Sequence, residues 1–121
     1  MEKAGVGLDF YMKTFHSDNY WSATPRAERP AQGLPRHDNM WCTWPEKTIE
    51  FMATVKKPWI AFKVLAAGAI HPREGFRFAF ENGADFINVG MFDFQVREDA
   101  ILTQQIITDV NQKGRRRSWA G

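Results

Sequence analysis

The chain has a single cysteine, Cys42, among 121 residues, so no internal disulfide can form. This composition fits a reducing compartment. No run approaches the roughly 18 apolar residues of a membrane-spanning helix, and the charged start Met1-Glu-Lys3 lacks the hydrophobic region of a signal peptide. We therefore expect a soluble protein, cytoplasmic by default. If the chain is part of a longer one, a targeting signal would lie upstream of Met1.

Neither sign of charge dominates the chain. Four of its 16 basic residues lie near the end, at Lys113, Arg115, Arg116 and Arg117, and the rest carries 12 basic against 14 acidic residues. The body is thus slightly acidic, and only the tail at 112–121 is basic. Such a tail is typical of a short solvated terminus. We expect neither a nucleic acid nor a membrane as partner.

Three apolar segments have the composition of β-strands, at residues 8–15, 59–67 and 85–90. The first two carry one lysine each, Lys13 and Lys63, and lysine is rarely buried without a reason. Side chains alternate along a strand, so each lysine lies opposite the more apolar face of its segment. That face consists of Phe10 and Met12 in the first segment and of Ile60, Phe62, Val64 and Ala66 in the second. We expect helices on the apolar faces and both amines on the other side of the sheet.

Helical patterns lie between these segments and after the last one. Thr43-Trp-Pro-Glu46 has the form of a capping box and predicts a helix to about Val55. A second helix is expected from Pro72 to about Gly83, with Phe76, Ala79 and Phe80 at helical spacing. A third is expected from near Val96, with Leu102, Ile106 and Val110 on its buried face. Strands that alternate with helices indicate a parallel sheet with right-handed crossovers.

The fold class predicted from this order is α/β, a partial (β/α)8 TIM barrel. A closed eight-stranded barrel needs roughly 200 residues or more, so we expect the last three βα units with parallel strands, in a single domain at residues 1–121. Three strands leave two bare edges. We therefore expect either a missing N-terminal barrel half or a homo-oligomer.

The long segment at residues 16–44 has no sustained periodicity and is predicted to be an active-site loop. Its aromatic residues favour an ordered loop over a disordered linker, and Trp41 and Trp44 are expected to pack within it. Within it, His16 and Asp18, with His37, Asp38 or Cys42, have side chains that can bind a divalent metal. The spacing does not favour such a site over hydrogen bonds that shape the loop. We predict no metal, and place His16 and Asp18 among the substrate-binding residues.

Two glycine turns follow consecutive strands. Gly68 and Ala69 come after the second strand, and Gly90 and Met91 after the third. Backbone amides in such turns can bind an anion, as in the phosphate sites of many βα barrels. The alternative is two ordinary strand-to-helix turns. Asn88 either orients a substrate oxygen or bonds to a lysine.

Several short motifs carry a resemblance to known proteins. They are Ala4-Gly5, Asp9-Phe10, Lys13-Thr14, Lys63, Gly83-Ala-Asp85 and Val89-Gly90. In these motifs the chain resembles the C-terminal part of class I aldolases of the deoxyribose-phosphate aldolase type. The resemblance implies that Lys13 forms a Schiff base with a substrate carbonyl, and that Lys63 is its electrostatic neighbour. The strings at residues 13–18, 20–25 and 90–96 also resemble a group of bacterial barrel proteins of uncharacterised function.

The function expected from these residues is binding of a small phosphorylated or anionic carbonyl substrate, with Schiff-base aldolase or lyase chemistry and no cofactor. An alternative is a phosphate- or flavin-binding barrel of other chemistry, such as an isomerase, a synthase or an oxidoreductase. A further alternative is a non-catalytic truncated fragment.

Overall fold

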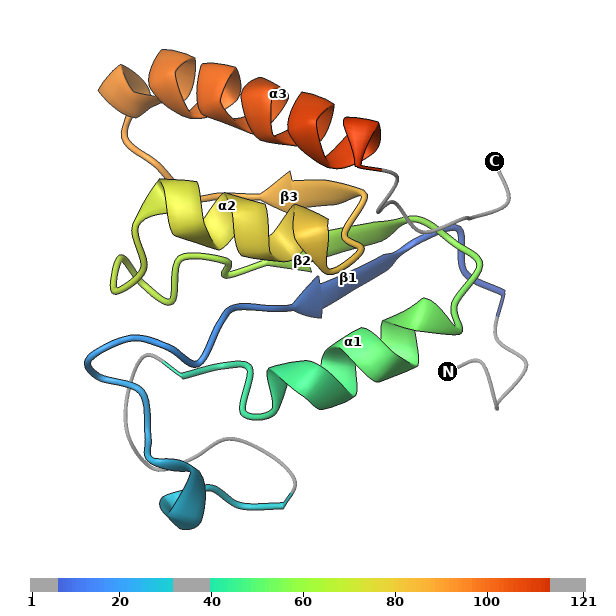
Figure 1. The fold of residues 1–121 in the computed structure, drawn as a ribbon, viewed down its shortest axis with the longest axis vertical. Coiled ribbons are helices and arrows are strands. Elements are labelled where there is room, and N and C mark those ends of the chain that lie inside the picture. The colour runs from blue at the N-terminus through green and yellow to red at the C-terminus, as the bar shows by residue number, and fades with distance from the viewer. Residues whose placement is uncertain (1–6, 32–39, 114–121) are drawn as a thin grey trace.

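The computed structural model describes residues 7–31 and 40–113 of the chain. The described part is a small α/β unit with one sheet (Figure 1). Its strands are β1 (Tyr11–Thr14), β2 (Trp59–Phe62) and β3 (Phe86–Asn88), and its helices are α1 (Pro45–Ala53), α2 (Pro72–Glu81) and α3 (Val96–Gln112). Two short 3-10 helices, η2 (Arg26–Glu28) and η3 (Asp93–Gln95), complete the described elements.

The three strands form one parallel sheet in the order β1-β2-β3. Lys13 pairs with Ala61, and Ile60 pairs with Phe86. The parallel pairing is as the sequence predicts, because α1 and α2 connect the strands as crossovers. The prediction of a partial TIM barrel, with three βα units in order, is wrong. Strands of only three or four residues form a short open sheet and not a section of barrel wall.

The buried stripes of the helices follow the sequence pattern. Met52 on α1, Phe76 and Ala79 on α2, and Ile106 and Val110 on α3 are each at most 1% exposed. Figure 1 shows α2 lying across the sheet with α3 beside it, while α1 lies next to β1. The helices therefore bury their apolar stripes on one side of the unit.

The start of α1 differs from the predicted capping box. Trp44 is the N-cap residue and makes no side-chain cap bond, while Pro45 occupies the first turn as expected. The carboxylate of Glu46 accepts a hydrogen bond from Arg26. Thr43 lies one residue before the cap, where its carbonyl oxygen accepts a bond from Arg29.

The face of the sheet that is buried is the opposite of the predicted one. Phe15, Trp59 and Ala61 are fully buried in the core, whereas Met12 and Phe86 are about half exposed. The largest rings decide the orientation, because Phe15 packs edge-on against Trp59 at 4.9 Å and stacks on Phe78 at 4.8 Å.

The alternation of side chains ends at the last residue of β2. Lys63 has a φ of 57° and turns the chain out of the strand. The sequence pattern places Ile60, Phe62, Val64 and Ala66 on one face. After the turn at Lys63, Val64 and Ala66 are buried, whereas Ile60 and Phe62 lie on the side of the sheet that no described helix covers. A strand pattern extended to residue 67 could not show this change, because it assumes a straight strand.

Candidate functional site

The carboxyl edge of the sheet gathers most of the residues predicted to act. In open parallel sheets, ligands bind outside the carboxyl ends of the strands. At this edge, the long loop follows β1 and a tight turn at residues 63–71 follows β2. The loop is described at residues 15–31 and 40–44, and the predicted candidates His37 and Asp38 lie outside the described residues.

His16 is a buried anchor of the long loop. Its Nε2 accepts hydrogen bonds from the backbone amides of Trp41 at 3.0 Å and Cys42 at 2.9 Å. The proton must therefore reside on Nδ1, which lies 2.9 Å from the carbonyl oxygen of Ser17. Burial lowers the pKa of this imidazole. Both ring nitrogens are occupied, so His16 shapes the loop.

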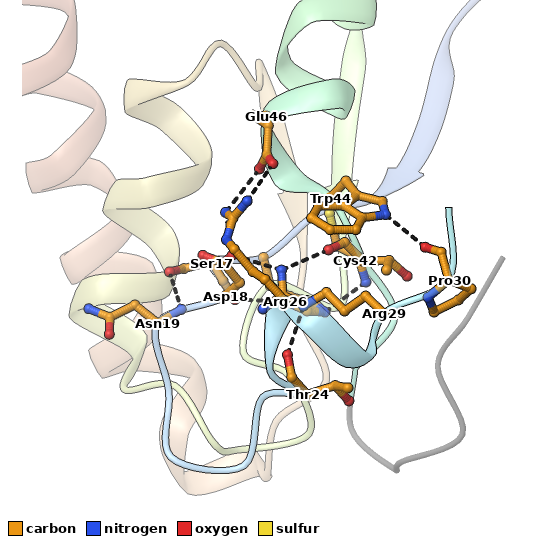
Figure 2. Close-up of polar contacts among 12 residues, drawn as sticks. Ser17, Asp18, Asn19, Thr24, Arg26, Arg29, Pro30, Cys42, Trp44 and Glu46 are labelled. Carbon is orange, nitrogen blue, oxygen red and sulfur yellow. Dashed lines mark hydrogen bonds and ion pairs between the residues drawn. The ribbon is translucent and has the colours of Figure 1, made fainter. Parts of the chain in front are cut away.

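Asp18 is held by two arginines (Figure 2). One of its oxygens lies 2.6 Å from Arg26 and 2.9 Å from Arg29. Burial alone would raise the pKa of Asp18, but the hydrogen bond from Arg29 and the charges of both arginines outweigh it and hold the pKa below its usual value. Arg26 also binds Glu46 at the start of α1, at 2.8 Å. The carboxylate of Asp18 thus ties the loop to the helix.

Arg29 has a nearly buried guanidinium at the centre of this network. Its side chain is 3% exposed and donates to the carbonyl oxygens of Thr24 and Thr43, in addition to Asp18. It lies over the ring of Trp44 at 5.4 Å, and the indole of Trp44 donates to the carbonyl oxygen of Pro30 (Figure 2). Because these partners all belong to the long loop, the buried guanidinium stabilises one conformation of that loop.

Cys42 adds no reactive group to the described part of the edge. Burial raises the pKa of the Cys42 thiol, while its contact with His16 and the charge of Lys13 act in the opposite direction. The Sγ atom lies 3.8 Å from the hydroxyl of Thr48. Within residues 7–31 and 40–113, no three histidine, cysteine or acidic side chains form a group that could hold a metal ion.

Lys63 stands directly after β2 in a strained turn. It has a φ of 57°, and Ala66 and Ala67 have φ values of 47° and 56°. In the described ranges, these are the non-glycine residues with positive φ. Such a conformation costs about 1 to 2 kcal/mol for each residue with a Cβ atom. The amine of Lys63 lies 4.7 Å from the ring centre of Trp41 and 5.1 Å from that of Phe62.

Lys13 stands on the helix-covered face of the sheet, contrary to the expectation. It pairs with buried Ala61, and its own side chain is exposed to solvent. Its charge acts on the thiol of Cys42, next to the residue whose ring contacts Lys63.

The backbone amides of Gly68 and Ala69, which were predicted to bind an anion, are already hydrogen-bonded within the turn. The amide of Gly68 donates to the carbonyl oxygen of Leu65, and that of Ala69 to the carbonyl oxygen of Ala66. Backbone amides at the start of α2 are also hydrogen-bonded. The ring of His71 accepts from the amide of Arg73, and its carbonyl oxygen accepts from the amides of Glu74 and Gly75. An anion at this edge would meet lysine side chains and few free amides.

Asn88, Gly90 and Met91 belong to another part of the surface. Asn88 and Met91 line a groove with Met12, Ile60 and Phe86, and the other wall of this groove is α3. Gly90 is exposed, with open space where a Cβ atom would stand. The structure thus divides the predicted site in two: the lysines and the long loop on one side, and an apolar groove on the other.

Sequence reasoning missed Arg29 and the contact of Lys63 with the ring of Trp41. The partners of Arg29 come from three separate loop positions, and no local spacing indicates such a set. The contact between Lys63 and Trp41 joins residues 22 positions apart and depends on how the loop folds back. The only local signal was the gathering of aromatic residues in the loop.

No helix in the described ranges is long and apolar enough to cross a membrane. Comparisons with protein-family models, with curated proteins and with solved structures found no match to this chain. The resemblance to class I aldolases stays a prediction.

Proposed function

We propose that this protein binds a small anionic carbonyl compound, phosphorylated or carboxylated, at the carboxyl edge of β1 and β2. The observation that carries the proposal is the pair of lysines at this edge. In the described ranges, no carboxylate lies within ion-pair distance of Lys13 or Lys63, whereas Asp18 and Glu46 are bound by Arg26. Amines without a counter-charge attract an anionic ligand.

The strained turn supports a role for Lys63 in particular. Backbone strain persists where the surrounding structure holds it, and it is concentrated at ligand-binding and active sites. The turn holds Lys63 at the end of β2, where its amine lies against the ring of Trp41. That contact limits the freedom of the side chain before any ligand arrives, which lowers the entropy lost on binding.

Lys13 has two possible chemical roles at this edge. As a cation it attracts the anionic group of the ligand. As a neutral amine it would attack the carbonyl carbon, with loss of water, to give an imine. The aldolase resemblance supports the second role, and the exposed position of Lys13 gives a small ligand access to its amine.

Binding is tested by titrating the protein with inorganic phosphate and with a phosphorylated aldehyde, followed by amide NMR shifts. We expect shifts at Trp41, Cys42 and the turn that begins at Lys63. An exposed charge pair contributes up to about 1 kcal/mol, so Lys63→Met should weaken binding about fivefold. The control is Lys56→Met, which removes an exposed lysine before the start of β2. Equal effects of the two substitutions would contradict the proposal.

The covalent role is tested separately with borohydride. Reduction in the presence of the phosphorylated aldehyde should add the mass of the reduced adduct to Lys13. Lys13→Arg keeps the charge but cannot form an imine, so it should abolish the adduct and retain phosphate binding. An adduct that persists in Lys13→Arg would show that Lys13 is not the nucleophile. Binding without any adduct would limit Lys13 to the electrostatic role.

A further inference from the structure

The imidazole of His16 holds Trp41 through both its backbone and its ring. The Nε2 atom accepts hydrogen bonds from the backbone amides of Trp41 at 3.0 Å and of Cys42 at 2.9 Å. The ring of His16 also meets the ring of Trp41 edge-on, with the two ring centres 6.4 Å apart. The amine of Lys63 lies 4.7 Å from the centre of the same Trp41 ring. A series of direct contacts therefore leads from His16 to a lysine of the proposed ligand site.

These contacts require a neutral imidazole. The Nδ1 atom carries the proton and lies 2.9 Å from the carbonyl oxygen of Ser17, which leaves the lone pair of Nε2 for the two amides. A second proton, on Nε2, would face two N–H donors and no acceptor. His16 is 1% exposed, so an imidazolium there would gain no contact with solvent unless the loop moved. A proton on Nε2 and the bonds from Trp41 and Cys42 therefore exclude each other.

The titratable groups around His16 leave burial as the dominant effect. Asp18 favours the imidazolium by its charge and Arg29 disfavours it, and these two groups are paired with each other at 2.9 Å. Tyr20 meets the ring of His16 edge-on at 5.7 Å, and burial raises its pKa to about 12. Burial also raises the pKa of the Cys42 thiol, so both groups are neutral here. Burial lowers the pKa of His16, which keeps its imidazole neutral above about pH 6.5.

Trp41 is the contact that connects Lys63 to the long loop. The amine of Lys63 lies over the rings of Trp41 and Phe62, at 4.7 and 5.1 Å. Phe62 is the preceding residue in the chain, whereas Trp41 is placed by the loop. The face of an aromatic ring attracts an ammonium group. Movement of Trp41 would thus return freedom to the Lys63 side chain and increase the entropy lost when an anion binds.

We propose that His16 is a positioning residue that makes anion binding at Lys63 dependent on pH. Neutral His16 holds Trp41 against Lys63. A proton taken from solvent by Nε2 displaces the amides of Trp41 and Cys42, and the ring of Trp41 then leaves the amine. This inference rests on the proposed function, because it concerns the regulation of the same site. Carboxylates that become neutral at low pH would make the chain more positive and strengthen anion binding, so the predicted weakening has the opposite sign.

The first test uses the protein without a ligand. NMR of the Lys63 side-chain methylene groups, at about pH 7.5 and about pH 5, follows the contact with Trp41 directly. The ring of Trp41 should shift these signals at the higher pH, and that shift should be lost at the lower pH. His16→Gln keeps an acceptor and a donor but does not titrate, so it should retain the shift at both pH values. Trp41→Leu removes the ring and should lack the shift at both.

The second test measures binding of inorganic sulfate, which keeps both negative charges at these two pH values. The wild-type chain should bind sulfate about fivefold more weakly at the lower pH, which is the effect expected for removal of Lys63. His16→Gln should change by less than about twofold. Trp41→Leu should bind at the higher pH as weakly as the wild-type chain does at the lower pH. Signals of the buried residues Phe76 and Val110 report whether each chain is folded.

A Lys63 shift that is the same at both pH values in the wild-type chain would overturn the proposal. So would a shift that is lost equally in folded His16→Gln, sulfate binding that strengthens at the lower pH, or loss of the core signals together with the shift. If His16→Gln does not fold, the comparison of the wild-type chain with Trp41→Leu decides. Sulfate that binds at neither pH would contradict the proposed function, and the shift of Lys63 without a ligand would still test the role of His16.

Discussion

At the scale of single residues, the long loop depends on two side chains with many partners. His16 accepts two backbone amides and Arg29 donates to two carbonyl oxygens and a carboxylate. The sequence presented His16 and Asp18 as candidate ligands, but their partners are loop atoms. Such sets could not be predicted, because their members lie up to 26 positions apart and meet only after the loop has folded.

The burial of His16 predicts a pH dependence of stability. The folded pKa of His16 lies below the usual 6.5, so the unfolded chain binds the proton more readily. The stabilisation is complete above about pH 6.5 and is lost as the pH falls through the lowered folded pKa. The limiting slope is about 1.4 kcal/mol per pH unit.

Urea unfolding at several pH values between 7.5 and 5 measures this slope. His16→Gln keeps an acceptor oxygen but removes the titration, so its stability should fall less between pH 6.5 and 5. Equal slopes for the wild-type chain and His16→Gln would contradict the role of His16.

At the scale of elements, periodicity predicts the helices well and the sheet poorly. The apolar spacing on α2 and α3 correctly identifies Phe76, Ala79, Ile106 and Val110 as buried. In the strands, both faces are apolar, and alternation cannot say which one receives the helices. The positive φ of Lys63 ends β2 early, and no sequence signal marks a lysine for that conformation.

The strained turn predicts a gain in stability at Ala67. This residue is exposed and has a φ of 56°, which glycine adopts without steric cost. We expect Ala67→Gly to raise the free energy of unfolding by about 1 kcal/mol. Ala100→Gly, on the exposed side of α3, is the control and should lower it by about 1 kcal/mol. A loss of stability in Ala67→Gly would show that the turn is not strained at this position.

The close packing of α2 against the turn predicts a loss of stability when Gly75 is replaced by alanine. A Cβ atom there would lie 2.7 Å from Leu65 and 2.8 Å from the carbonyl oxygen of Val64. Because a backbone atom cannot move aside easily, Gly75→Ala should cost about 1 to 3 kcal/mol despite the better helix propensity of alanine. Gly90→Ala meets nothing within 4 Å and should change stability by less than about 0.5 kcal/mol. Urea unfolding of both variants compares these costs, and similar losses would contradict the close approach.

At the scale of the whole molecule, alternation of strands and helices predicts a parallel α/β arrangement but not its closure. The barrel prediction assigned three units to a larger architecture. In residues 7–31 and 40–113 the structure is instead a short open sheet, and no described helix covers its apolar face with Met12 and Phe86.

The central claim of this account is that Lys13 and Lys63, which have no carboxylate partner in the described part of the chain, bind an anion at the carboxyl edge of the sheet. The most direct measurement is the NMR titration of wild-type protein, Lys63→Met and Lys56→Met with inorganic phosphate. The account predicts saturable shifts at Trp41 and Cys42 that weaken about fivefold in Lys63→Met and persist in Lys56→Met. Shifts that are absent, or that are unchanged in Lys63→Met, would contradict it.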